Sequence, residues 1–145
     1  MGKGTVLKCP KCNSEYDLFL GNGMRSFCEE QLFNFSNDSD ENIIVRSKEN
    51  EIDNLLELQN FLKLKNIKIN QNFGNDYYYC DKCKCFEVRF YYYLKSSGKI
   101  FSPKYRCKRC NSKLNHTHKK NMVYNHYCSK CNIPMKETGL YIYWD

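Results

Sequence analysis

The alternation of apolar and polar residues predicts short strands near the start of the chain and through its second half. Residues 13–20, NSEYDLFL, place Tyr16, Leu18 and Leu20 on one face, with the two-residue period of a half-buried strand. Residues 86–94, FEVRFYYYL, have one predicted face of Phe86, Val88, Phe90, Tyr92 and Leu94 and another of Glu87, Arg89, Tyr91 and Tyr93. Residues 140–145, LYIYWD, alternate again, and KSSG at 95–98 predicts a turn.

The middle of the chain has helical spacing instead. Residues 47–66, SKENEIDNLLELQNFLKLKN, repeat apolar residues every three to four positions, at Ile52, Leu55, Leu56 and Leu62. Ser47 is the expected N-cap of this helix. A shorter helix is expected at about 26–34, and residues 36–42, SNDSDEN, predict a loop between the two.

Cysteines are the strongest chemical signal. No apolar run is long enough to cross a membrane, and the first residues lack the apolar core of a signal peptide. We therefore expect a cytoplasmic protein with reduced thiols. Eight of the ten cysteines form four CxxC pairs: Cys9/Cys12, Cys80/Cys83, Cys107/Cys110 and Cys128/Cys131. Two CxxC loops complete one tetrahedral zinc site, so the sequence predicts two zinc ions per chain, held by these eight residues.

The four CxxC loops, called knuckles below, resemble one another. Each has a basic residue just before its second cysteine, and in three knuckles an asparagine follows that cysteine. Asparagine tolerates the positive φ of a sharp turn, whereas Lys84 stands at this position in the second knuckle and predicts a distortion there. CPKC at 9–12 also has the spacing of a redox motif, but a strand pattern follows it where that motif needs a helix. Cys28 and Cys85 are expected to be small buried residues rather than ligands.

Spacing alone leaves two ways of pairing the knuckles open. Seventeen residues separate Cys110 from Cys128, which fits the C-x2-C-x15–20-C-x2-C zinc pattern and favours one site made by the last two knuckles. We then expect a zinc ribbon in residues 1–98, completed by Cys80/Cys83 and carrying a helical insertion at about 21–76, and a C-terminal zinc ribbon in residues 99–145. The competing arrangement joins the second knuckle to the third, and the first to the fourth.

The run CPKCNSEYDLFLGNGM, the helical segments, CDKC and the following basic CxxC pair together resemble a group of small bacterial zinc-ribbon proteins of unknown activity. The resemblance covers most of the chain and rests mainly on the knuckles. It implies zinc and a ribbon fold, and it implies no activity. The predicted fold class is small α+β, with zinc-ribbon antiparallel strands, a helical insertion and two structural zinc sites.

Charge is unevenly distributed. Residues 1–20 carry a net charge of +1, residues 21–76 of −4 and residues 77–145 of +10, and eleven of the twelve tyrosines lie in the last segment. Basic groups attract phosphates and exposed rings stack on unpaired bases, so we predict a module that binds DNA or RNA through this half. The candidate contacts are Lys104, Arg106, Lys108, Arg109, Lys113, Lys119, Lys120, Tyr91 and Tyr93, with Tyr124 and Tyr141 as further stacking rings. Core packing is the alternative role of these tyrosines.

A protein-interaction module is the alternative function. The apolar stripe of the acidic helical insertion would then face a protein partner within a larger complex. Packing of the same stripe onto the ribbon is the commoner fate of such a face.

Enzymatic activity is not expected. A closed four-cysteine site leaves no open position for a metal-bound water, and only three histidines are present. The run LNHTH…YNHYC invites comparison with histidine–asparagine–histidine nucleases, but the seventeen-residue gap is too short for their usual core. We expect His116 and His118 to be exposed at the tip of a hairpin spanning 111–127.

Overall fold

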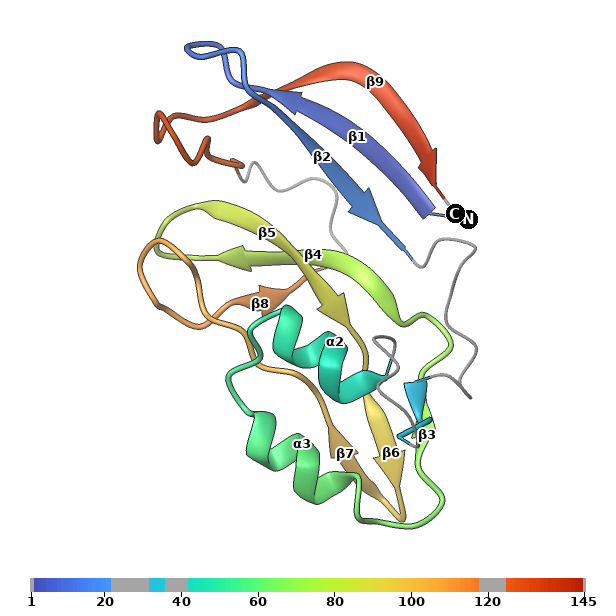
Figure 1. Cartoon of the computed structure of the whole chain (residues 1–145). Helices are drawn as coiled ribbons and strands as arrows, with labels where there is room; N and C mark the ends of the chain where they lie inside the picture. The colour runs from blue at the N-terminus through green and yellow to red at the C-terminus, as the bar shows by residue number, and fades with distance from the viewer. Residues whose placement is uncertain (1, 22–31, 36–41, 118–124, 145) are drawn as a thin grey trace.

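The computed structural model describes residues 2–21, 32–35, 42–117 and 125–144 and arranges them in small antiparallel sheets with two helices (Figure 1). The elements are β1 (Gly2–Lys8), β2 (Glu15–Leu20), α2 (Ile43–Glu49), α3 (Leu55–Phe61), β3 (Lys68–Ile69), β4 (Gly74–Cys80), β5 (Cys85–Tyr91), β6 (Leu94–Ser96), β7 (Lys99–Phe101), β8 (Asn115–His116) and β9 (Lys136–Trp144). The strand orders are β2-β1-β9, β5-β4-β8 and β3-β6-β7. The predicted class, antiparallel ribbon strands with a helical insertion, is confirmed.

The first sheet joins the two ends of the chain. β1 is its central strand, and Thr5 lies opposite Leu18 of β2 and Tyr141 of β9. The register between β1 and β9 shifts between Thr5 and Leu7, and Gly139, with φ of 78°, lies in β9 at this irregularity. Because β9 follows the fourth knuckle and β1 precedes the first, this pairing brings the two knuckles together (Figure 1).

The predicted helix over 47–66 is two short helices. α2 begins after Asn42, whose side chain accepts a hydrogen bond from the Val45 N–H at 3.0 Å. Ser47 is therefore inside α2 rather than at a cap, and its hydroxyl lies 2.7 Å from that of Tyr92. The helix ends with Asn50 as its C-cap, where two oxygens of Asn50 bind to β5. The side-chain oxygen of Asn50 accepts a hydrogen bond from the Phe90 N–H, and its backbone carbonyl accepts one from the Arg89 guanidinium.

The larger core lies between the helices and the third sheet. Its buried side chains are Leu32, Ile43, Leu58, Phe90, Tyr92, Leu94 and Phe101. The predicted apolar face of residues 86–94 therefore enters the core over its last half, although the strand is interrupted between β5 and β6. The predicted turn at 95–98 joins β6 to β7, with positive φ at Ser97 and Gly98.

Several predicted features lie outside the described residues. They are most of the short helix at 26–34 and of the loop at 36–42, together with Cys28, His118, Lys119, Lys120 and Tyr124. Within the described part of the chain, no helix combines the length and the apolar character that crossing a membrane requires.

Candidate metal centres and basic surface

All four knuckles adopt the same turn. The residue after the second cysteine has positive φ in each: 59° at Asn13, 52° at Lys84, 60° at Asn111 and 56° at Asn132. Its N–H donates to the carbonyl of the first cysteine at 2.8–3.0 Å. The expected distortion of the second knuckle is wrong, because the knuckle turn imposes the left-handed conformation on a lysine as well.

The eight knuckle cysteines converge in two groups of four. Cys9, Cys12, Cys128 and Cys131 form the first centre, and Cys80, Cys83, Cys107 and Cys110 form the second. Within each centre all four Sγ atoms lie within 4.8 Å of one another. Individual Sγ–Sγ distances are 3.7 Å between Cys12 and Cys128, 3.4 Å between Cys80 and Cys110 and 4.0 Å between Cys83 and Cys107. None of the nine described cysteines forms a disulfide.

These distances fit a tetrahedral metal ion. With metal–sulfur bonds of about 2.3 Å, the edge of a four-sulfur tetrahedron is about 3.8 Å. The donor set of each centre therefore fits one tetrahedral ion, and both can hold a metal.

The pairing preferred from the sequence is wrong, and the competing one is found. Instead of sharing a site with the third knuckle, the fourth lies beside the first because β9 pairs with β1. The third knuckle lies beside the second because β8 pairs with β4 and Tyr105 packs against Tyr78. The first ribbon thus consists of the two chain ends, and the insertion between them is far longer than the expected 21–76.

Hydrogen bonds at the two centres lower the pKa of some thiols and raise the pKa of others. The Ser14 side chain lowers the pKa of Cys12 to about 6, and Ser112 does the same for Cys110. The hydrogen bond to Cys12 raises the pKa of Cys131 to about 12. Because thiolates this close repel one another, ionisation of all four thiols requires a cation at their centre. The geometry therefore favours metal binding over a set of free thiols.

Cys85 is a fifth thiol at the second centre. It is buried as predicted, and its Sγ lies 3.9 Å from that of Cys107. The tetrahedral set is complete without it. Sequence reasoning missed this contact, although the short spacing in CDKCKC was a visible signal.

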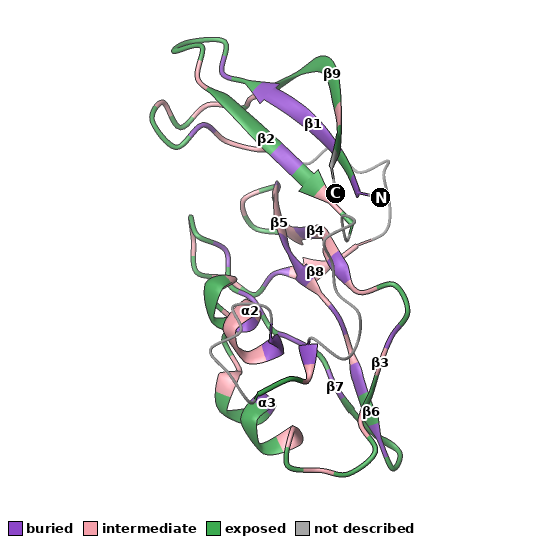
Figure 2. Ribbon diagram, turned by 45° about the vertical axis from the view of Figure 1, so that its right-hand side comes forward, coloured by how far each residue is buried: buried purple, intermediate pink, exposed green. Residues whose placement is uncertain are grey.

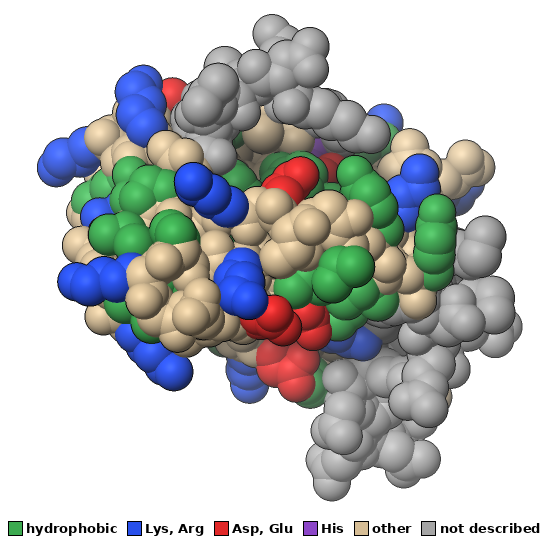
Figure 3. All heavy atoms as spheres, turned by 90° about the horizontal axis from the view of Figure 1, so that it is seen from above, with side chains coloured by type: hydrophobic (Ala, Val, Ile, Leu, Met, Phe, Trp, Pro, Cys, Tyr) green, Lys and Arg blue, Asp and Glu red, His purple; other side chains and the backbone are tan. Residues whose placement is uncertain are grey.

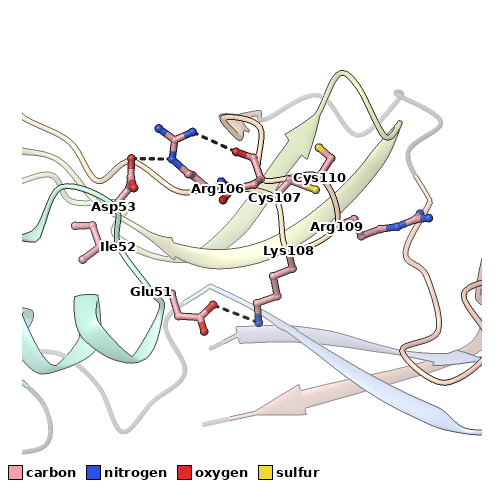
Figure 4. A pocket seen from close by; sticks show the side chains of 9 residues that line it. Glu51, Ile52, Asp53, Arg106, Cys107, Lys108, Arg109 and Cys110 are labelled. Atoms are coloured by element: carbon pink, nitrogen blue, oxygen red, sulfur yellow. Dashed lines mark hydrogen bonds and ion pairs between the residues drawn. The ribbon is translucent and has the colours of Figure 1, made fainter.

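Several predicted phosphate contacts are ion-paired with the acidic helical segment. Lys104 lies 3.5 Å from Glu57, and Arg106 lies 3.1 Å from Asp53. Lys108 lies 3.8 Å from Glu51. Figure 4 shows the last two pairs beside Cys107 and Cys110 of the second centre. The net charges of −4 and +10 along the sequence thus partly cancel across this contact.

The other two described basic candidates are exposed. Lys113 lies opposite Arg106 in an isolated bridge. The guanidinium of Arg109 lies over the Tyr127 ring, 3.7 Å from its centroid. Because Arg109 belongs to the second ribbon and Tyr127 leads into the fourth knuckle, this contact links the two ribbons.

Of the tyrosines chosen from the sequence, Tyr91 and Tyr93 are not among the most exposed, whereas Tyr141 is. Tyr91 is half-buried and stacks on His116 with 3.8 Å between ring centroids, and Tyr93 is also half-buried, with the Lys95 ammonium over its ring. Tyr141 and Tyr143 of β9 are 74% and 72% exposed. Figure 2 shows β9 as largely exposed beside the buried β1.

The expected exposure of His116 at a hairpin tip is also wrong. His116 is in β8 opposite Tyr78, and its Nε2 lies 2.8 Å from a carboxylate oxygen of Asp76. Its ring packs against the Tyr91 and Tyr78 rings. These contacts indicate a structural role for His116.

Comparison with protein-family models, curated proteins and solved structures finds no match for this chain. The likeness to zinc-ribbon proteins therefore rests on the two cysteine centres.

Proposed function

We propose that the protein is a zinc-binding, non-catalytic module whose two zinc ions hold its ribbons together. The observation that carries this proposal is the convergence of eight thiols in two sets of four, with all Sγ atoms of a set within 4.8 Å of one another. Four-thiolate tetrahedral sites favour zinc or iron. Four protein ligands fill the coordination sphere of zinc and leave no position for a reactive water. Reduced thiols of this kind support a cytoplasmic location.

Removal of the metal tests this structural role. A structural zinc ion contributes on the order of 10–16 kcal/mol of apparent binding energy at neutral pH, whereas a domain is typically stable by about 5–15 kcal/mol. A strong chelator should therefore abolish the near-ultraviolet circular dichroism of the full-length protein under reducing conditions, and added zinc should restore it. A spectrum unchanged by complete metal removal would contradict the proposal.

Within this role we propose binding of single-stranded DNA or RNA by the first sheet. Tyr141 and Tyr143 share one face of β9, and Lys3 lies directly opposite Tyr143 on β1. Exposed rings beside basic groups are the usual platform for unpaired bases. Figure 3, which looks down on this sheet from the top of Figure 1, shows exposed hydrophobic side chains with Lys and Arg side chains near them, and Asp and Glu on the same face. Lys113 and Arg109 remain candidates for phosphate contact from the predicted set.

A protein partner for the acidic helical insertion has less support. Leu58 of α3 is fully buried, and Leu55, Phe61 and Leu62 pack against the same core. Leu56 is the exposed exception in this helix. The apolar stripe expected to face a protein partner thus packs mostly against the protein's own core.

Fluorescence anisotropy with labelled single-stranded DNA, single-stranded RNA and duplex DNA at low salt tests the second proposal. We expect tighter binding to single strands. With about four to six phosphate contacts, the log–log dependence of affinity on salt should have a slope of roughly −3 to −5. Absence of binding to any of these probes would end the nucleic-acid proposal and favour a protein partner, without affecting the zinc proposal.

A further inference from the structure

We propose that Cys85 is a reserve ligand of the second metal centre and can replace Cys107 on the metal. This inference rests on the proposed zinc binding and extends it to a residue outside the two tetrahedral sets. Cys85 is 3% exposed, and its sulfur lies as close to Cys107 as Cys83 does, at 3.9 Å against 4.0 Å. Among the nine cysteines that the structure describes, Cys85 is the one outside the two sets, and its sulfur lies at ligand-to-ligand distance from that of Cys107.

The position of Cys85 in its knuckle distinguishes the second centre from the first. In the other three knuckles the first cysteine donates its N–H to the carbonyl of the residue five positions later, namely Ser14, Ser112 or Ile133. In the second knuckle the equivalent residue is Cys85, which pairs with Cys80 across the β4–β5 hairpin. The same turn thus places a thiol where the other knuckles place a hydroxyl or an alkyl group. Among the described residues, the first centre has no such additional cysteine.

Replacement would be a simple ligand exchange. The metal–sulfur bond to Cys107 breaks and one to Cys85 forms, while the proton of the Cys85 thiol passes to the departing Cys107 thiolate. Four thiolates bind the ion before and after the step, so its charge and oxidation state do not change. Both residues are buried within the same small core, which keeps competing water away from the exchanging sulfurs.

The test uses the full-length protein with cobalt(II) in place of zinc, because the thiolate-to-cobalt charge-transfer absorbance increases with the number of bound thiolates. Cys107→Ser should keep two cobalt ions per chain and an undiminished charge-transfer absorbance. Cys107→Ala should behave identically, because rescue by Cys85 does not use the serine hydroxyl. Adding Cys85→Ser to either variant should lower the absorbance by at least one thiolate in eight or release one cobalt ion.

Two controls define the comparison. Cys85→Ser alone should bind two cobalt ions with normal absorbance, and Cys128→Ser, the equivalent change in the first centre, should lose absorbance although Cys85 is present. Equal thiolate counts in Cys107→Ser with and without Cys85 would overturn the proposal, as would loss of metal or failure to fold in Cys107→Ser itself. Fewer than two ions in the wild-type protein would instead refute the two-centre proposal on which this one rests.

Discussion

The Sγ atoms of Cys12 and Cys128 lie 3.7 Å apart although 116 positions separate the two residues in the chain. A metal ion between them would close nearly the whole chain into a loop, with the second centre inside that loop. The two centres are therefore nested rather than consecutive. Loss of the outer centre should free both chain ends and leave the inner one intact.

The nesting predicts how fragments behave. A fragment spanning residues 42–117 contains all four ligands of the second centre with both helices, and it should bind one zinc ion and fold. A fragment spanning 99–145 contains one knuckle from each centre, and it should not fold when zinc is added. Circular dichroism with zinc titration measures both outcomes. Cooperative folding of the 99–145 fragment around one zinc ion would show that the last two knuckles share a site after all.

Lys84 offers a test of the knuckle turn. It is the only one of the four equivalent knuckle residues that is not asparagine. Its φ of 52° brings Cβ close to the following carbonyl oxygen, a cost that asparagine offsets by hydrogen bonding locally and lysine does not. Lys84→Asn should raise the free energy of unfolding by up to about 1 kcal/mol, measured by denaturant titration of the metal-loaded protein. Lys82→Asn removes the same charge from the same knuckle at a position without positive φ, and it should have no such effect. If both changes raised the free energy of unfolding equally, the gain would come from the lost charge and not from the backbone conformation.

Local features were predictable from the sequence, and long-range ones were not. The CxxC spacing and the asparagines of the knuckles are properties of five consecutive residues, so ligand identity and turn conformation follow from them. The choice between pairings depends on β9 crossing back to β1, and no local pattern specifies the partner of a strand. The segment between Cys110 and Cys128 has a suitable length for closing one site, but it connects the two ribbons instead.

The partial burial of Tyr91 and Tyr93 was unpredictable for the same reason. The alternation of apolar and polar residues correctly separated the two faces of residues 86–94. It could not show that other parts of the chain would pack against both faces. Asn50 and Arg89 meet on the side expected to face solvent, and Arg89 is buried there. The break at Asn50 was also hidden, because its cause is a hydrogen bond from a strand forty positions away.

Two exposed rings should dominate binding to single strands. Tyr141→Ala and Tyr143→Ala should each weaken binding to single-stranded nucleic acid by about 1–3 kcal/mol, the usual value of one base stack. Their melting temperatures should stay close to that of the wild type, because both rings are mostly exposed. Tyr91→Ala is the matched control: it should lower the melting temperature through loss of its stack on His116, with little effect on affinity. Weaker binding in Tyr91→Ala, with unchanged affinity in Tyr141→Ala and Tyr143→Ala, would instead show that Tyr91 stacks on the bases.

The acidic helical segment should weaken nucleic-acid binding by occupying basic groups. Asp53→Asn with Glu57→Gln releases Arg106 and Lys104 from their ion pairs. Exposed pairs of this kind are worth about 0.2–1 kcal/mol each, so anisotropy at low salt should show a severalfold higher affinity.

Glu49→Gln controls for the change in net charge. Glu49 is exposed and forms no ion pair within the described part of the chain. An equal gain in affinity from Glu49→Gln and from a single change at Asp53 would mean that only overall charge matters.

The metal content of the purified full-length protein tests the central claim most directly. Elemental analysis of protein prepared under reducing conditions, without added metal, should find two zinc ions per chain, one for each four-cysteine centre. A value near one zinc ion per chain, or iron in place of zinc, would contradict the account of two structural zinc centres.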